Sequence, residues 1–268
     1  MKTNTFQMTF IIFMIGIVSL LSASNVFADA HESEGDMAPE AEAMEEKPGV
    51  TGWFQIDIDS LGSYFLIGAN HPIGDSGISI ASNIYINEKH DIIPDNPDDP
   101  DDMHSHDIHS HRYLGEFDLG VTVPIVSSDS LSLALQPMVG IGFDYTGEDG
   151  PHALYPQIFA FLNAPNITFF HWTIGTVYSV FDDMRSNELY NRSFLTYSLT
   201  DTIAIGLQFE TVFVFADELD KPLKLNVGPR INIAYGTANT LGIYVGYETK
   251  KAEGDSGFTG RMNFTRVW

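Results

Sequence analysis

The sequence predicts an all-β chain that folds as a transmembrane, antiparallel, up-and-down β-barrel of about 12 strands. Three observations lead to this fold class. Apolar and polar residues alternate with a period of two from Gly49 onward, which is typical of strands with two different faces. Most of these segments are as long as a tilted strand that crosses a bilayer, roughly 9–11 residues. The connections between them are mostly short on one side and long on the other, as in barrels of outer membranes.

The start of the chain has a different composition. Residues 1–28 predict a secretory signal peptide, since Lys2 is followed by a largely apolar run over 10–21 and a small-residue cleavage pattern that ends at Ala28. Residues 29–48 contain eight acidic residues and almost no large apolar side chains. Such a segment buries too little apolar surface to fold, so we expect a disordered acidic tail, with a short exposed helix as the alternative.

Overall composition excludes several classes of protein. The chain has 268 residues, a formal net charge of −23 and no cysteine. Disulfides and thiolate metal sites are therefore excluded. With only 13 Lys and Arg residues, the chain also lacks the basic clusters that bind nucleic acid.

The barrel is predicted over residues 49–268, and its clearest strand follows residue 130. Leu133, Leu135, Ile141 and Phe143 share one face there, while Gln136 lies on the other. An even number of strands with alternately short and long connections favours a membrane barrel. The strands are expected at roughly 51–59, 62–70, 77–87, 113–124, 130–145, 153–162, 166–178, 189–199, 202–215, 222–235, 240–250 and 257–268.

Some segments fit this pattern badly. Strands 6 and 7, at 153–162 and 166–178, are apolar on both faces, which suggests that they pack against a neighbour in a trimer. Pro137, Pro156 and Pro229 fall inside strands, where each removes a donor from the ladder, so we expect bulges at these points.

A soluble β-sandwich or a lipocalin-like barrel would also show alternation. Aromatic residues near the ends of strands favour the membrane, because they form girdles at the two interfaces of the bilayer. The residues concerned are Tyr113, Tyr145, Phe215, Tyr235, Tyr247 and Phe258.

The last twelve residues, GFTGRMNFTRVW, place Phe258, Met262, Phe264 and Trp268 in phase on one face. This stretch resembles the terminal strand signal of Gram-negative outer-membrane β-barrel proteins of the porin-like kind, and departs from it at Arg266. The resemblance implies an outer-membrane location, contact with outer-membrane lipid and recognition by the barrel-assembly machinery. With a periplasmic N-terminus, the long loops would face out of the cell.

If the apolar face of each strand contacts lipid, the residues on its other face point into the lumen. The acidic residues then come from strands 1, 4 and 5, and the basic ones from strands 8, 10 and 12. An acidic wall opposite a partly basic wall would produce a field across a narrow channel. The alternative is that these charges pair across the lumen and close it. The predicted lumen and selectivity residues are Asp57, Asp59, Glu116, Asp118, Asp144, Arg192, Lys224, Arg230 and Arg261.

One external loop, over residues 88–112, is rich in aspartate and histidine. Three prolines at intervals of three favour an extended polyproline conformation in its first half. Neutral imidazoles beside carboxylates suit weak binding of Zn²⁺, Cu²⁺ or Ni²⁺. A solvated loop that only shields the surface is the alternative. The candidate metal ligands are His104, His106, His109 and His111.

The function predicted from these features is passive diffusion of small hydrophilic solutes through an outer-membrane channel, with metal-ion capture at its mouth. No cofactor is required. Alternatives are a closed surface barrel with adhesive or ligand-binding loops and an outer-membrane lipid hydrolase. Ser105 and Ser110 lie in a loop in which nothing fixes a general base in hydrogen-bonding geometry beside them. Both GDSG stretches, at 74–77 and 254–257, lie between strands, where Gly, Asp and Ser are common turn residues, so we expect no enzyme.

Overall fold

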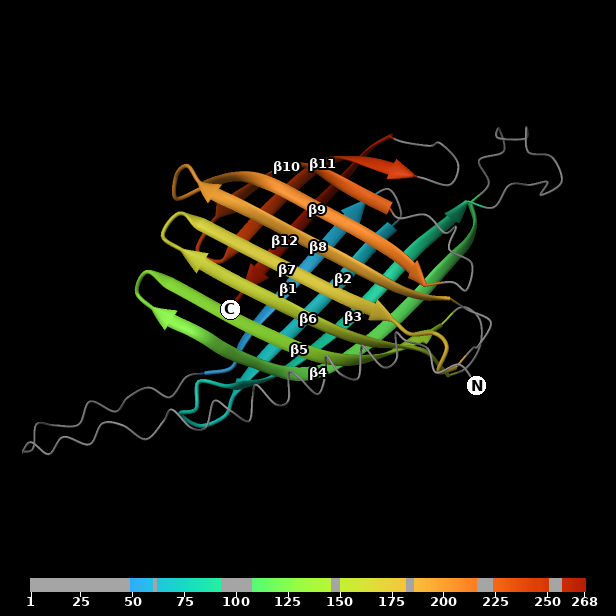
Figure 1. Ribbon diagram of the computed structural model, residues 1–268, viewed down its shortest axis with the longest axis horizontal. Helices are drawn as coiled ribbons and strands as arrows, with labels where there is room; N and C mark the ends of the chain where they lie inside the picture. Colours follow the sequence, from blue (N-terminus) through green and yellow to red (C-terminus); the bar gives the residue numbers. More distant parts are fainter. Residues whose placement is uncertain are drawn as a thin grey trace, which may run out of the picture. The chain divides into compact units, whose positions relative to one another are not determined.

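A computed structural model describes residues 49–59, 62–92, 108–145, 150–181, 186–215, 224–250 and 257–268. Twelve strands form in these residues, and each pairs with its neighbours in sequence. Because β1 also pairs with β12, the sheet closes into an antiparallel barrel (Figure 1), and the predicted fold class is confirmed. The strands are β1 (Thr51–Asp59), β2 (Gly62–Pro72), β3 (Ser79–Ile92), β4 (Ile108–Ser128), β5 (Leu131–Asp144), β6 (Pro151–Ala164), β7 (Ile167–Thr176), β8 (Asn187–Ser198), β9 (Ile203–Phe215), β10 (Lys224–Tyr235), β11 (Asn239–Lys250) and β12 (Gly257–Val267).

The two ends of the barrel differ in their connections. At one end five hairpins close through short turns, of which residues 73–78 form the longest. Three of these turns, after β4, β6 and β8, stand together in Figure 1. We call this the short-turn end and the opposite one the long-loop end. Residues 1–48 lie outside the described residues, so the signal peptide and the acidic tail stay predictions.

The predicted loop at 88–112 is partly strand. The ladder between β3 and β4 continues through the pair His90 and His111, and reaches Ile92 and Ile108 after a register shift. The apolar alternation fades here although the pairing continues, because a strand beyond the bilayer needs no lipid-facing side. Only residues 93–107 of this loop lie outside the described residues.

The bulges expected at three prolines are not found. Pairing runs without a shift through Pro137 and Pro156, and the register on both sides of Pro229 is the same. A missing N–H removes one bond from the ladder but does not require an extra residue. The shifts in the described strands occur elsewhere, between Asp91 and Ile92, beside Pro124, and at the start of β6.

The distribution of side chains is the reverse of that in a soluble protein. In the described residues, buried polar side chains outnumber buried apolar ones. Large apolar side chains such as Ile84, Leu119 and Leu207 are instead exposed on the outer surface, at 46%, 52% and 63%. The six aromatic residues expected near strand ends are all exposed as well. This arrangement suits a barrel surrounded by hydrocarbon, in which closure satisfies every backbone group of the sheet.

None of the described residues forms a helix that is both long and apolar enough to cross a membrane.

The apolar second face of β6 and β7 lies inside the barrel. Tyr155 and Phe159 are buried at 8% and 5% exposure, and Trp172 packs against the same interior cluster. The neighbouring Leu154 and Ile158 have the opposite parity and face outward. The two-sided pattern that suggested a trimer is therefore accounted for within one chain.

Candidate functional site

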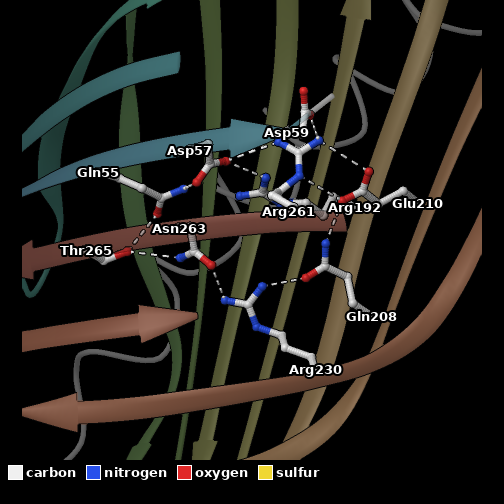
Figure 2. A network of polar contacts seen from close by, with 10 residues as sticks. All are labelled: Gln55, Asp57, Asp59, Arg192, Gln208, Glu210, Arg230, Arg261, Asn263 and Thr265. Carbon is white, nitrogen blue, oxygen red and sulfur yellow. Dashed lines mark hydrogen bonds and ion pairs between the residues drawn. The ribbon is translucent and has the colours of Figure 1, made fainter. Parts of the chain in front are cut away.

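An ion-pair network crosses the interior of the barrel. Asp57 on β1 accepts a hydrogen bond of 2.7 Å from Nη1 of Arg192 on β8, and its side chain is 3% exposed. The same carboxylate lies 3.3 Å from Arg261 on β12 and accepts a bond of 2.8 Å from Gln55. Since β1 and β8 lie in opposite parts of the barrel wall, this pair bridges the lumen (Figure 2).

Arg261 joins two further carboxylates to this bridge. Its Nη2 lies 2.8 Å from Asp59, and its Nε lies 3.3 Å from Glu210 on β9. Two guanidinium groups therefore neutralise most of the charge on three carboxylates. Such compensation is what allows these ions to be buried.

Arg230 lies in a second layer and differs from the other two arginines. Its guanidinium donates to the side-chain oxygens of Gln208, Asn263 and Asn232 at 2.5, 2.8 and 2.8 Å. Gln208 in turn donates to Glu210 and links the two layers. No carboxylate of the described residues forms an ion pair with Arg230, which is only 4% exposed.

The side of the lumen formed by β6, β7 and β8 is aromatic. The rings of Phe159 and Trp172 stack with centroids 5.5 Å apart, and those of Phe170 and Phe194 stack at 4.9 Å. Phe161 contacts both Phe159 and Phe170, which makes the surface continuous. We call these five residues the aromatic wall; aromatic pairs of this kind add about 0.5–1.5 kcal/mol each beyond their burial.

Two cavities occupy the lumen. The first, of about 970 Å³, opens among residues of the short-turn end, and the second, of about 360 Å³, lies toward the long-loop end. We call them the short-turn chamber and the long-loop chamber. Both are bordered by Leu66, Tyr85, Trp172 and Arg192, so these four residues stand between the two chambers, and we call their level of the lumen the constriction.

The charges of the lumen are separated along the barrel rather than across it. Among the described residues, six carboxylate and two arginine side chains border the long-loop chamber, a formal charge of −4. The short-turn chamber is bordered by Arg192, Arg230 and, in the turn after β8, Asp201. Glu188, Glu210 and Glu248 border the long-loop chamber on the side that was expected to be partly basic, so the expected field between an acidic and a partly basic wall stays a prediction.

The predicted lumen residues have different surroundings. Asp57, Asp59, Glu116, Arg192 and Arg261 border the long-loop chamber, and Arg230 borders the other. Asp118 and Asp144 border neither chamber. The backbone of Lys224 begins β10.

Asp118 is enclosed rather than exposed to the passage. It is 0% exposed, and neither carboxylate oxygen has a hydrogen-bond partner among the described residues. Glu116, the next inward residue of β4, accepts a bond of 3.0 Å from Gln157. Gly140 leaves the space for both carboxylates, since a Cβ there would lie 1.8 Å from Asp118 Oδ1.

Several residues of the site were not among the predicted ones. Asn263 has the inward parity of its strand and, together with Gln208, holds Arg230, but it carries no charge. The aromatic wall was visible in the sequence only as strands that are apolar on both faces. Large side chains at the inward-facing positions of a strand, rather than charged ones, indicate these residues in the sequence.

The predicted metal ligands are divided between strand and undescribed segment. His109 and His111 belong to strand β4, whereas His104 and His106 lie outside the described residues. Within the part of the chain that the structure describes, no three His, Asp or Glu side chains gather as a metal site. Metal binding by this segment stays a prediction.

Comparisons with known proteins agree with the barrel. Searches with models of protein families and among curated proteins gave no match. Among solved structures, an outer-membrane channel from Pseudomonas putida F1 is similar, with a TM-score of 0.50, 10% identity and coverage of 86% of this chain and 100% of that one. The CymD monoaromatic hydrocarbon channel has a TM-score of 0.44 and 6% identity, over 84% and 90% of the two chains. The KdgM porin has 0.44 and 7%, over 81% and 98%.

Identities this low show only the fold. The similarity in fold, together with the apolar outer surface and the polar lumen, confirms the architecture that the resemblance of the C-terminal stretch implied. The chain is a closed, twelve-stranded antiparallel barrel with the fold of the Gram-negative outer-membrane β-barrel channels.

Proposed function

We propose that this barrel is an outer-membrane channel for passive diffusion of small solutes. The observation that carries the proposal is that both chambers border the same four residues, Leu66, Tyr85, Trp172 and Arg192. From this shared boundary we infer that the two chambers form one passage, with the constriction at these four residues. In this proposal the short-turn end is periplasmic and the long-loop end faces out of the cell.

A channel and a closed barrel differ at this constriction. The pair of Asp57 and Arg192 crosses the lumen at this height, next to Trp172, whose ring lies 5.6 Å from the guanidinium carbon. A passage limited by two side chains conducts small solutes and ions slowly. A larger conductance should follow when those side chains are shortened.

Single-channel recording in planar lipid bilayers tests this directly. The double variant Asp57→Ala with Arg192→Ala removes both charges together and leaves neither one unpaired. We expect a measurable conductance for the unmodified protein and a severalfold larger one for the double variant. Leu195→Ala, on the outer surface at 53% exposure, is the matched control and should leave the conductance unchanged.

Two results would refute the channel. If neither the unmodified protein nor the double variant conducts, the barrel is closed, and its loops become the candidate binding surface. If the control changes the conductance as much as the double variant does, the current does not pass the proposed constriction. Release of fatty acids from lipid by the purified protein would instead favour the hydrolase.

A further inference from the structure

Arg230 is a buried cation without a counterion among the described residues. It is 4% exposed and borders the short-turn chamber. Its three hydrogen-bond partners, Gln208, Asn232 and Asn263, are neutral amides. A guanidinium carries five N–H groups, so two remain beyond these three bonds. Burying a charge without an opposite charge is costly, and the planar fork of arginine matches a carboxylate.

The surface next to this cation is aromatic. The guanidinium carbon lies 4.2 Å from the centroid of the Phe194 ring, and Phe194 stacks on Phe170. Through Phe161 and Phe159 the aromatic wall continues to Trp172 at the constriction. Because the guanidinium covers one face of the Phe194 ring and Phe170 covers the other, a carboxylate at the edge of Arg230 leaves its flat apolar group against the edge of Phe194, next to the rest of the aromatic wall.

The other charges of the chamber do not supply the missing anion. Arg192 is paired with Asp57 at 2.7 Å. Asp201 belongs to the turn that follows β8 and forms no ion pair with Arg230, both residues being in the described part of the chain. The volume of about 970 Å³ is within the range of pockets that enclose small organic molecules, about 300–1,000 Å³.

From these contacts we infer that the short-turn chamber binds aromatic carboxylates, with the carboxylate at the edge of Arg230 and the ring against the edge of Phe194 and the neighbouring aromatic wall. The inference deepens the proposed function by naming a class of solute that the passage selects. It also separates two contributions. The cation recognises the charge, and the wall recognises the ring, so a solute that lacks either one binds more weakly.

Binding is measured with the full chain in detergent micelles, by isothermal titration with benzoate. Acetate lacks the ring and benzyl alcohol lacks the charge, and each should bind at least tenfold more weakly than benzoate. Arg230→Gln should weaken benzoate binding at least tenfold and leave benzyl alcohol unchanged. Phe194→Leu keeps the cation and should weaken benzoate severalfold while leaving acetate unchanged.

Two variants keep the test decisive if one fails to fold. Heat-induced mobility shift on gels reports whether each barrel is folded, and the folded variant of the two then provides the comparison. The inference is overturned if folded, unmodified protein does not bind benzoate, if acetate binds equally well, or if a folded Arg230→Gln variant binds benzoate as tightly as the unmodified protein does.

The outcome is independent of the channel. A protein that binds benzoate but carries no current refutes the proposed function and keeps the site. A protein that conducts but does not distinguish benzoate from acetate keeps the channel and refutes the site.

Discussion

Replacing Asp118 by asparagine should stabilise the barrel. The side chain is 0% exposed, its two oxygens have no hydrogen-bond partner among the described residues, and Glu116 is the next inward residue of the same strand. Burial of an ion without compensation costs several kcal/mol, whereas an unsatisfied neutral amide costs about 1–3 kcal/mol. Asp118→Asn keeps the shape and removes the negative charge; because a buried carboxyl can also take up a proton, we expect a gain of at most about 2 kcal/mol in the free energy of unfolding.

The same chemical change at Asp57 should have the opposite sign. Asp57 is also buried, at 2% exposure, but it is the carboxylate that compensates Arg192. When Asp57 is neutralised, Arg261 still forms ion pairs with Asp59 and Glu210, whereas Arg192 is left without an ion pair among the described residues. Breaking a buried pair on one side costs about 3–5 kcal/mol, so Asp57→Asn should destabilise by an amount of that order.

Both variants are compared with the unmodified protein by urea unfolding in lipid vesicles, followed by tryptophan fluorescence. The midpoints should move in opposite directions while the slopes stay equal, since the surface exposed on unfolding does not change. Loss of stability in Asp118→Asn would refute the argument that this carboxylate is uncompensated. A gain in Asp57→Asn would show that the pair with Arg192 does not offset its own desolvation.

Three further predictions concern the outer surface, the acidic chamber and the histidine segment. Leu207→Arg, near the middle of β9 and 63% exposed, should destabilise the vesicle-inserted barrel by about 2–4 kcal/mol, and Ile73→Arg in a turn by at most about 1 kcal/mol. Equal effects in urea titrations would mean that Leu207 does not face lipid. The acidic long-loop chamber should give the channel a weak preference for cations, which Glu188→Gln together with Glu248→Gln should reduce. A reversal potential in a salt gradient that does not change in this double variant would exclude these residues from the passage. Calorimetric titration with Zn²⁺ should give weak binding that is lost below about pH 6, as imidazoles protonate. Equal heats from the unmodified protein and from a chain without residues 93–107, which keeps both paired strands, would assign this segment to shielding alone.

The sequence was sufficient to predict the strands because lipid imposes the same requirement on each of them. Every second side chain must be apolar across the bilayer, so the alternation from Leu131 onward marks a strand without reference to its neighbours. The requirement ends where the strand leaves the membrane. For this reason the extension of β3 to Ile92 and of β4 back to Ile108 was missed.

The interior could be predicted only in part, because parity gives the direction of a side chain and not its height or its partners. Asp57 and Asp118 both face inward, yet one bridges the lumen to Arg192 and the other is enclosed beside Gly140. The bridge joins residues 135 positions apart on β1 and β8, and it depends on the stagger of all the strands between them. No local pattern in the sequence contains that information.

The aromatic wall and the separation of charge along the barrel together explain how one narrow passage can treat ions and organic solutes differently. The long-loop chamber, with a formal charge of −4, acts at a distance and favours the entry of cations. At the constriction the charges of Asp57 and Arg192 compensate each other, so no ion meets a strong trap there. Beyond it, the uncompensated charge of Arg230 attracts anions, and the rings of Phe194 and Phe170 act at contact distance. Conduction requires binding that is favourable but weak, and two different, separated contacts achieve this better than one deep charged site.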